Sequence, residues 1–312
     1  PVNLVRDVWQ GASFEELPML EAESRVRATL KVQEGCNQFC TYCIIPYARG
    51  PVRSREPEKA LAEAHKLVEA GYKELVLTGI HTGAYGLDLG VDLNYLVSGL
   101  AKIPGLKRLR ISSVESVEFT PELIDTIAES STICHHLHIP LQSGSDHILA
   151  RMNRPYTTRD FAEIINQIRR KIPGVAITTD VIVGFPGEDE AEHQASLKFA
   201  REMKFAGIHV FKYSPRTGTP AAGYPDQVEQ AVKEERSKDF LLLARESWQE
   251  YAGRFLGQEL EVLLEQPVGE EHWEGHTDNY LRVRFPGQGE RGDFVKVKLQ
   301  KLARDFMVGT KV

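Results

Sequence analysis

The sequence predicts an α/β protein in which six strands alternate with helices, followed by one long helix and a small β-rich module. Three patterns indicate this organisation. Short apolar segments alternate with segments of helical spacing, residues 226–255 are amphipathic throughout, and β-type segments with turn residues follow Gly257. Because strands that alternate with helices form parallel sheets, we expect either an open parallel sheet or a partial (β/α) barrel. Its chemistry should lie at the carboxyl ends of the strands.

The six expected strands share an apolar or alternating pattern, and they cover residues 24–33, 73–80, 106–114, 135–144, 175–188 and 207–215. Apolar residues at helical spacing mark the expected helices at 57–71, 93–103, 120–130, 145–152, 157–172 and 189–203. Pro57 suits a first helical turn, Gly71 a helix end and Thr120 an N-cap. Beyond the long helix, β-type segments are expected at 258–266, 280–289, 292–302 and 306–312.

The overall composition is that of a globular protein with a core. Of the 312 residues, 42% are hydrophobic and 26% are charged, and the formal net charge of −6 gives no bulk attraction to nucleic acid. Any RNA contact must therefore come from a local patch of Lys and Arg. No apolar run approaches the roughly 18 residues of a membrane helix, so no membrane partner is expected. Because the chain starts with Pro1 and without a signal pattern, we expect a fragment whose natural beginning is lost.

The cysteines are concentrated in one short segment. Cys36, Cys40 and Cys43 follow a C-x3-C-x2-C spacing, and Cys134 stands alone. This distribution is not a disulfide framework, so no disulfide partner is expected. In a reducing cytosol it is typical of metal ligands. The segment also contains four turn-forming residues, which favour a loop over a continuous helix: Gly35, Pro46, Gly50 and Pro51.

Two metal sites fit the three thiols. A structural zinc site takes four ligands, and Cys134 or a histidine would have to supply the fourth through space. An iron–sulfur cluster is held by thiolates, and three protein ligands would leave one iron open. The third interpretation is that the thiols are inert and buried. The presence of three cysteines in one loop rich in Gly and Pro disfavours it.

Four segments carry a family resemblance: GCNQFCTYCIIPYARGPVRSR (35–55), PLQSGSDHILARMNRPYT (140–157), TTDVIVGFPGE (178–188) and FKYSPRTGTPAA (211–222). They resemble the radical S-adenosylmethionine (SAM) methylthiotransferases, which replace C–H by C–SCH3. The resemblance implies a partial (β/α)6 TIM-like barrel followed by a TRAM-like β-barrel. It also implies a [4Fe–4S] cluster bound by Cys36, Cys40 and Cys43. In the superfamily the open iron is chelated by SAM, and an electron from the reduced cluster yields a 5′-deoxyadenosyl radical.

The segment LTGIHTGAYG (77–86) resembles the MtaB-type members, which modify N6-threonylcarbamoyladenosine beside the anticodon of tRNA. We therefore expect a cytoplasmic tRNA-modifying transferase whose partners are tRNA and a cellular electron donor. Two alternatives stay open. One is a methylthiotransferase of the ribosomal-protein type, which shares the barrel and the terminal module. The other is a zinc-stapled RNA-binding protein without catalysis.

The resemblance covers residues 25–312 and departs from the family in one respect. Family members carry a preceding domain whose three cysteines hold an auxiliary [4Fe–4S] cluster, and Cys134 is the sole cysteine here outside the triplet. We thus expect a fragment that binds one cluster and SAM but does not complete methylthiolation. The expected organisation is a linker at 1–24, a radical SAM domain at 25–225, a connecting helix at 226–256 and a TRAM-like β-barrel at 257–312.

The resemblance also indicates positions for cofactor contacts, which are Tyr42, Gly79, Ser113, Gln142, Asp180, Ile182 and Gly184. Gly79 allows close backbone approach, although a simple turn would also explain it. Asp180 lies in an apolar strand, so it is either a functional acceptor or half of a buried ion pair. The nearby His135, His136 and His138 are expected to be ordinary histidines rather than metal ligands.

The terminal module segregates its charge. Residues 279–312 hold eight basic residues against three acidic ones, interleaved with aromatic residues, which suits contact with an RNA backbone and bases. Lys-rich exposed strands also occur merely for solubility. The RNA-binding candidates are Arg282, Arg284, Lys296, Lys298 and Lys301.

Overall fold

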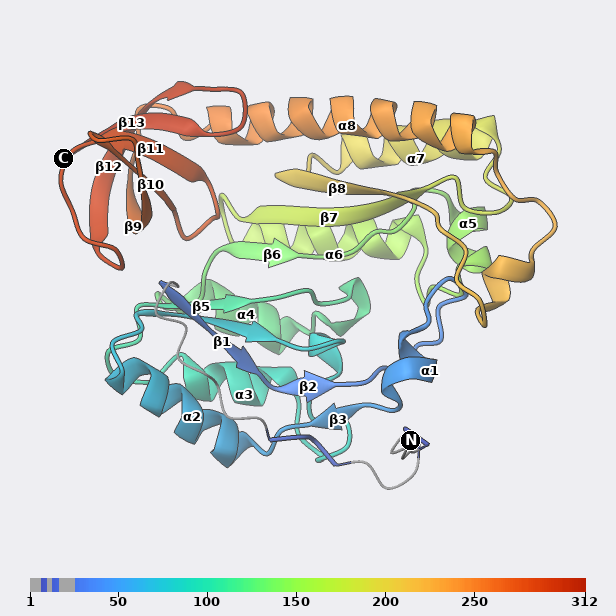
Figure 1. Cartoon of the computed structure of the whole chain (residues 1–312), viewed down its shortest axis with the longest axis horizontal. Coiled ribbons are helices and arrows are strands. Elements are labelled where there is room, and N and C mark those ends of the chain that lie inside the picture. Colours follow the sequence, from blue (N-terminus) through green and yellow to red (C-terminus); the bar gives the residue numbers. More distant parts are fainter. Residues whose placement is uncertain (1–6, 10–12, 17–25) are drawn as a thin grey trace, which may run out of the picture.

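The computed structural model describes residues 7–9, 13–16 and 26–312, and most of the expected linker at 1–24 lies outside these ranges. Figure 1 shows a curved α/β unit and a small β-barrel, with the long helix α8 (Gln230–Gly253) spanning the top of the α/β unit to reach the barrel. The α/β fold class is therefore confirmed. The domain boundaries given above stay a prediction.

Six parallel strands form the α/β unit, and all six were expected from the sequence. They are β1 (Arg27–Lys31), β4 (Glu74–Thr78), β5 (Arg108–Ile111), β6 (His136–His138), β7 (Ala176–Val183) and β8 (Gly207–Lys212). Hydrogen bonds order them as β1-β4-β5 and β6-β7-β8. Parallel bridges between Leu109 and Ile133 and between Ser113 and His138 join β5 to β6. The result is a partial barrel with β1 and β8 at its edges.

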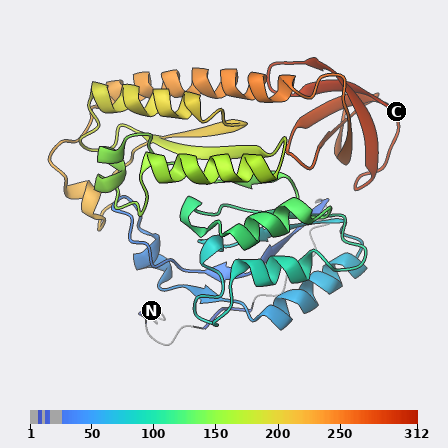
Figure 2. The same cartoon turned by 180° about the vertical axis from the view of Figure 1, so that it is seen from behind.

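Helices cover the outer face of this sheet (Figures 1 and 2). They are α2 (Pro57–Glu69), α3 (Leu93–Leu100), α4 (Pro121–Glu129), α5 (Asp146–Arg151), α6 (Thr158–Lys171) and α7 (Glu190–Glu202). Strand β7 shows why they pack there. Its outer positions, such as Val181 and Val183, are buried against the helices, whereas the inner positions Thr178, Asp180 and Ile182 are only half-buried. The inner face is therefore the accessible and more polar one.

The cysteine segment is more ordered than expected. Strands β2 (Gln33–Glu34) and β3 (Arg53–Ser54) pair as a small antiparallel ribbon, and helix α1 (Ile45–Arg49) lies between them. Three 3-10 helices, η1 (Thr82–Ala84), η2 (Ser116–Glu118) and η3 (Pro220–Gly223), shape the other loops. These short elements carry too few residues to show a period in the sequence.

Helix α8 begins at Gln230 rather than at 226. The physical reason lies at Asp226, whose carbonyl accepts a hydrogen bond from the Gly187 amide at 2.9 Å. The Asp226 carboxylate also pairs with Arg151 at 2.9 Å. These contacts tie the segment before the helix to the loop after β7, so the amphipathic pattern starts before the helix does.

The terminal module is a closed five-stranded barrel in the order β10-β11-β13-β12-β9. The strands are β9 (Glu259–Val268), β10 (His272–His276), β11 (Arg282–Pro286), β12 (Phe294–Leu302) and β13 (Met307–Lys311). The predicted β-barrel is confirmed, but the prediction of four strands omitted β10. Its sequence HWEGH is polar, and its burial does not alternate, since the neighbours Glu274 and Gly275 are both buried.

Across the described ranges of the chain, no helix has the length and apolar character needed to cross a membrane.

Candidate active site

The cysteine loop follows β1 and lies at the carboxyl-terminal end of the partial barrel. Contacts from distant segments hold it. The Cys36 amide donates to the Gly50 carbonyl at 3.1 Å, and the Thr41 amide donates to the Met152 carbonyl at 3.0 Å. The Thr41 carbonyl accepts from the Ala221 amide at 2.9 Å. Backbone bonds to three separate parts of the chain therefore fix the loop before any metal binds.

Gly35 starts the loop in the left-handed region, with φ of +69°. A Cβ atom there would lie 1.8 Å from the Pro51 carbonyl oxygen. Both the backbone angle and the close approach of the returning strand therefore require glycine at this position.

The three thiols fit an iron–sulfur cluster better than a single zinc ion. All four cysteines are free, with Cys40 and Cys134 buried and Cys36 and Cys43 half-buried. In a tetrahedral zinc site with Zn–S bonds of about 2.3 Å, the sulfurs would lie about 3.8 Å apart. Among the described residues, the one group of three ligands with atoms all within 4.8 Å of one another does not include these cysteines. The three sulfurs are thus not all gathered at the spacing of one zinc ion, and thiolates on three different irons do not require that spacing.

Arg154 faces Cys40 from the loop after α5. Its Nη1 donates to Cys40 Sγ at 3.3 Å and its Nε donates to the Tyr156 hydroxyl at 3.1 Å. The same guanidinium forms an ion pair with Glu115. The Arg154 side chain is only 2% exposed, so its positive charge is buried beside the Cys40 sulfur and not surrounded by water.

A second cation–carboxylate pair faces Cys36. The His81 Nδ1 lies 3.4 Å from Cys36 Sγ, and its Nε2 lies 2.5 Å from Glu118 Oε1. Burial alone would lower the His81 pKa, but the contacts with Cys36 and Glu118 outweigh it and raise the pKa to about 10. Burial raises the pKa of the Cys43 thiol, which has the Ile45 backbone amide beside it.

The predicted cofactor-contacting residues lie at the same end of the barrel as the thiols, because they follow or end parallel strands. Gly79 comes directly after β4, but its close neighbour is Gln33, whose Oε1 would lie 2.8 Å from an added Cβ. Ser113 follows β5, is exposed, and pairs with His138 through a backbone bridge. Tyr42 packs its ring edge-on to Phe185, with centroids 6.4 Å apart.

Gln142 and Gly184 both adopt positive φ, at 64° and 69°. The Gln142 amide donates to the Asp180 carbonyl at 2.8 Å, and the Ile182 amide donates to the Gln142 carbonyl at 2.9 Å. A Cβ on Gly184 would lie 2.3 Å from Lys233 Cγ of α8. The loop after β6 thus pairs with β7 through a parallel bridge between Gln142 and Val181, which brings Gln142 close to Asp180 and Ile182.

Asp180 binds two histidines on the inner face. Its Oδ2 lies 3.3 Å from His138 Nε2 and its Oδ1 lies 3.1 Å from His209 Nδ1. Burial by itself raises the Asp180 pKa, but the hydrogen bonds from both histidines hold this pKa well below its usual range. The hydrogen bond to Asp180 correspondingly raises the pKa of His209. Asp180 is therefore an ion-paired carboxylate in the barrel interior, next to the accessible side of Ile182.

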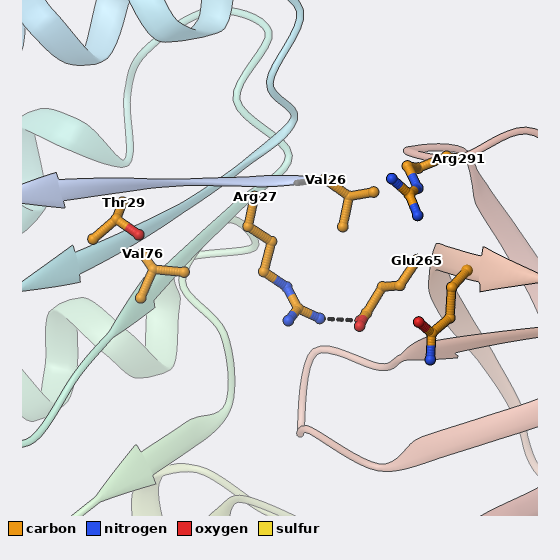
Figure 3. Close-up of a pocket in the computed structure, with 7 residues that line it drawn as sticks. Val26, Arg27, Thr29, Val76, Glu265 and Arg291 are labelled. Atoms are coloured by element: carbon orange, nitrogen blue, oxygen red, sulfur yellow. Dashed lines mark hydrogen bonds and ion pairs between the residues drawn. The ribbon is translucent and has the colours of Figure 1, made fainter. Parts of the chain in front are cut away.

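The β-barrel module docks on the opposite end of the partial barrel. Arg108 donates to the carbonyls of His276 and Glu261, at 3.0 and 2.7 Å, and Arg110 donates to the Asp278 carbonyl at 3.0 Å. Figure 3 shows Arg27 of β1 pointing toward Glu265 of β9, with which it forms an ion pair. Both residues line a cavity of about 330 Å³. The amino-terminal end of the partial barrel is thereby joined to the module.

The five RNA-binding candidates lie on the module, away from the cysteine loop. Arg282 pairs with Asp305, and Arg284 lies 2.5 Å from Glu274. Lys296 and Lys298 are exposed on β12, and their register partners on β9 are Glu261 and Glu259. Lys301 follows a bulge in β12 and is also exposed. Intramolecular acidic partners therefore offset much of the positive charge that the sequence indicated.

Sequence reasoning did not identify Arg154, Glu115, His81 or Glu118 as site residues. Arg154 lies in the segment MNRPYT and His81 directly follows TGI, both within segments that carried the resemblance. Only the fold places them against Cys40 and Cys36. Arg53, which flanks the cysteine loop, pairs with Glu34 at 3.0 Å rather than being simply solvated.

Comparison with known proteins identifies both parts of the chain. The Radical SAM superfamily matches residues 30–200, and the TRAM domain matches residues 253–312. The threonylcarbamoyladenosine tRNA methylthiotransferase MtaB of Bacillus subtilis is 47% identical over 99% of this chain and 70% of that protein. A tRNA-2-methylthio-N(6)-dimethylallyladenosine synthase of Moorella thermoacetica is 39% identical over 97% of this chain and 69% of that protein.

A solved structure shares the fold alone. TsrM from Kitasatospora setae, a radical SAM methyltransferase, superposes with a TM-score of 0.53 at 17% identity, over 62% of this chain and 38% of that one. Members of the superfamily bind a [4Fe–4S] cluster and SAM, and the three free thiols of the loop offer ligands for such a cluster. The fold, the two matched domains and the identity to these relatives together show that the chain belongs to the radical SAM tRNA methylthiotransferases.

Proposed function

We propose that the chain carries out the radical SAM chemistry that converts N6-threonylcarbamoyladenosine beside the anticodon of tRNA to its 2-methylthio derivative. The observation that carries this proposal is the fixed loop of three free thiols at the carboxyl-terminal end of the barrel, with Arg154 and His81 against two of them. The 47% identity to MtaB supports this substrate over other tRNA bases.

In this proposal Cys36, Cys40 and Cys43 hold the cluster. When bound and reduced, the cluster supplies the electron that breaks a carbon–sulfur bond of SAM. SAM would be held at the strand ends by Tyr42, Ile182 and five polar or backbone positions, which are Gly79, Ser113, Gln142, Asp180 and Gly184. These positions are supported by their common place at one end of the barrel.

The target adenosine enters the barrel interior from the open side, along β8. His209 and Phe211 lie two residues apart on this strand and are exposed, and His209 contacts Asp180 on the inner face. Residues two apart on a strand share a face, so the Phe211 ring faces the interior as well. An exposed aromatic ring beside polar groups suits stacking and hydrogen bonding of a nucleobase.

The TRAM module binds the surrounding tRNA, with Arg282, Arg284, Lys296, Lys298 and Lys301 as candidate contacts. A cellular reductant supplies the electron, and the reaction takes place in the cytoplasm, where tRNA is modified. Because Lys296 and Lys298 face Glu261 and Glu259, RNA phosphates must compete with internal acidic partners. We therefore expect modest, salt-sensitive affinity of the module.

The test compares three ligands under anaerobic conditions after reconstitution with iron and sulfide. An anticodon stem-loop carrying N6-threonylcarbamoyladenosine, the same stem-loop with unmodified adenosine, and a ribosomal protein are each titrated against the chain. The expected result is tightest binding of the modified stem-loop, weakened by salt, and release of 5′-deoxyadenosine from SAM on reduction. Preference for the ribosomal protein would favour the other class of methylthiotransferase and overturn the substrate proposal.

A further inference from the structure

The buried ion pair between Arg154 and Glu115 has an unusual position, because one end of it touches a candidate cluster ligand. Arg154 lies in the loop that follows α5, and Glu115 is the N-cap residue of η2 after β5. Their side chains are 2% and 13% exposed. Burying a charged pair costs free energy that hydrophobic residues would avoid, so a functional reason for it is expected.

The guanidinium of Arg154 is held from several sides. Glu115 accepts from Nη2, the Tyr156 hydroxyl accepts from Nε at 3.1 Å, and the Tyr42 hydroxyl lies 3.5 Å from Nη1. The Tyr156 hydroxyl in turn donates to the Pro140 carbonyl at 3.0 Å. These contacts leave Nη1 aimed at Cys40 Sγ, 3.3 Å away.

Glu115 is itself fixed by its turn. Its backbone amide donates to Glu118 Oε2 at 3.0 Å, and the reciprocal bond completes a capping box. The carboxylate therefore orients the guanidinium from a rigid element rather than from a mobile side chain. Glu115 is not one of the candidate metal ligands and acts through Arg154.

We propose that Arg154, positioned by Glu115, raises the reduction potential of the cluster through a charge-assisted hydrogen bond to the Cys40 thiolate. This inference rests on the proposed function, because it requires the cluster that the three cysteines hold. Adding an electron makes the cluster and its thiolates more negative. A cation and an N–H donor at a ligand sulfur stabilise that reduced state more than the oxidised state.

Two variants separate the effect of the Arg154 guanidinium on the cluster potential from the effect of the protein's net charge. The double variant R154M/E115Q removes one positive and one negative charge, so the net charge of the protein is unchanged. Because the guanidinium touches the sulfur and the carboxylate lies behind it, the double variant loses the closer charge. The single variant E115Q removes only the negative charge, and Arg154 stays in place because an amide oxygen can still accept the hydrogen bond from Nη2. The two variants are therefore expected to shift the potential in opposite directions.

A matched control is available on α6. Arg159 and Glu163 form an ion pair at 2.9 Å, with side chains 86% and 62% exposed. The variant R159M/E163Q makes the same two chemical changes at a solvated site. It should leave the cluster potential unchanged.

The experiment uses anaerobically reconstituted chains without SAM, with iron and sulfide counted and the potential followed by electron paramagnetic resonance. For R154M/E115Q we expect a reduced-to-oxidised ratio at least tenfold lower at a fixed potential, which is about 59 mV for a one-electron couple. E115Q should raise the ratio, and the control should match the wild type.

A fully loaded R154M/E115Q variant whose ratio stays within twofold of the wild type would overturn the inference. If the double variant does not retain four irons, the reduced-to-oxidised ratio of E115Q is the test instead. A ratio in E115Q that equals or falls below that of the wild type overturns the inference. A wild-type chain that holds no [4Fe–4S] cluster would instead refute the proposed function. The two failures are thus distinguishable.

Discussion

Glu74 is expected to be the most sensitive charged residue for the stability of the partial barrel. It begins β4 and lies directly opposite Arg27 of β1 and Arg108 of β5. Its carboxylate lies 2.7 Å from the Arg27 Nε, 3.1 Å from the Arg110 Nε and 3.7 Å from the Arg108 Nη1. The side chain is fully buried. Glu74 therefore pairs with three guanidinium groups, two of which also have a carboxylate partner on the β-barrel module: Glu265 for Arg27 and Glu261 for Arg108.

The substitution Glu74→Gln keeps the size of the side chain and removes its charge. Removing one partner of a buried ion pair costs about 3–5 kcal/mol. Here the buried guanidinium of Arg110 would be left with carbonyl acceptors in place of its carboxylate. At roughly 2–4 °C for each kcal/mol in a domain of this size, the unfolding midpoint should fall by roughly 6–20 °C. Since Arg108 and Arg110 also donate to carbonyls of the β-barrel module, docking of the module should weaken first.

Thermal unfolding followed by tryptophan fluorescence and by far-ultraviolet circular dichroism measures this effect. Trp248 and Trp273 pack in the core cluster of the module, so fluorescence reports on its docking. The control is Glu261→Gln, because Glu261 lies 3.7 Å from Arg108 but its side chain is 53% exposed. A midpoint for Glu74→Gln no lower than that of the control would refute the argument.

Three further predictions concern the site and the module. Gly35→Ala should abolish or greatly reduce cluster loading while the fold persists by circular dichroism, because its Cβ would clash with the returning strand 1.8 Å away; normal iron content would contradict this. In urea titrations, Asp180→Asn should lower the free energy of unfolding more at pH 6 than at pH 9. The pKa of His209 is raised in the folded protein, so the Asp180–His209 pair contributes fully below about pH 6.5 and loses its contribution as His209 deprotonates at higher pH. An equal loss at both pH values would refute that pairing. Replacing Lys296 and Lys298 by Ala should weaken stem-loop binding and reduce its salt slope by up to about two; an unchanged slope in a salt titration would remove these lysines from the interface.

The strands and helices of the partial barrel could be predicted because their packing leaves a local signature. The alternation in β7 records its two faces, and the apolar spacing of α2 or α6 records one buried side. The cysteine spacing likewise predicts the metal ligands without a structure, and the structure places these three thiols in one loop at the strand ends. Strand β10 was not predicted because its sequence is polar and its buried residues, Glu274 and Gly275, are adjacent rather than alternating.

The surroundings of the thiols could not be predicted, because they depend on contacts between distant residues. Arg154 lies 114 residues from Cys40 and 39 residues from Glu115 along the chain. No local pattern indicates that these three meet. The charge of the module shows the same limit, since the register that places Glu261 opposite Lys296 is a property of the barrel.

The account depends most on the claim that three thiolates hold an iron–sulfur cube with one iron left for SAM. The most direct measurement is the electron paramagnetic resonance spectrum of the anaerobically reconstituted, reduced chain before and after SAM is added, with metal and sulfide analysed on the same sample. We predict four irons and four sulfides per chain and a spectrum that changes when SAM binds. Bound zinc in place of iron, or a cluster spectrum that SAM leaves unaltered, would contradict the claim.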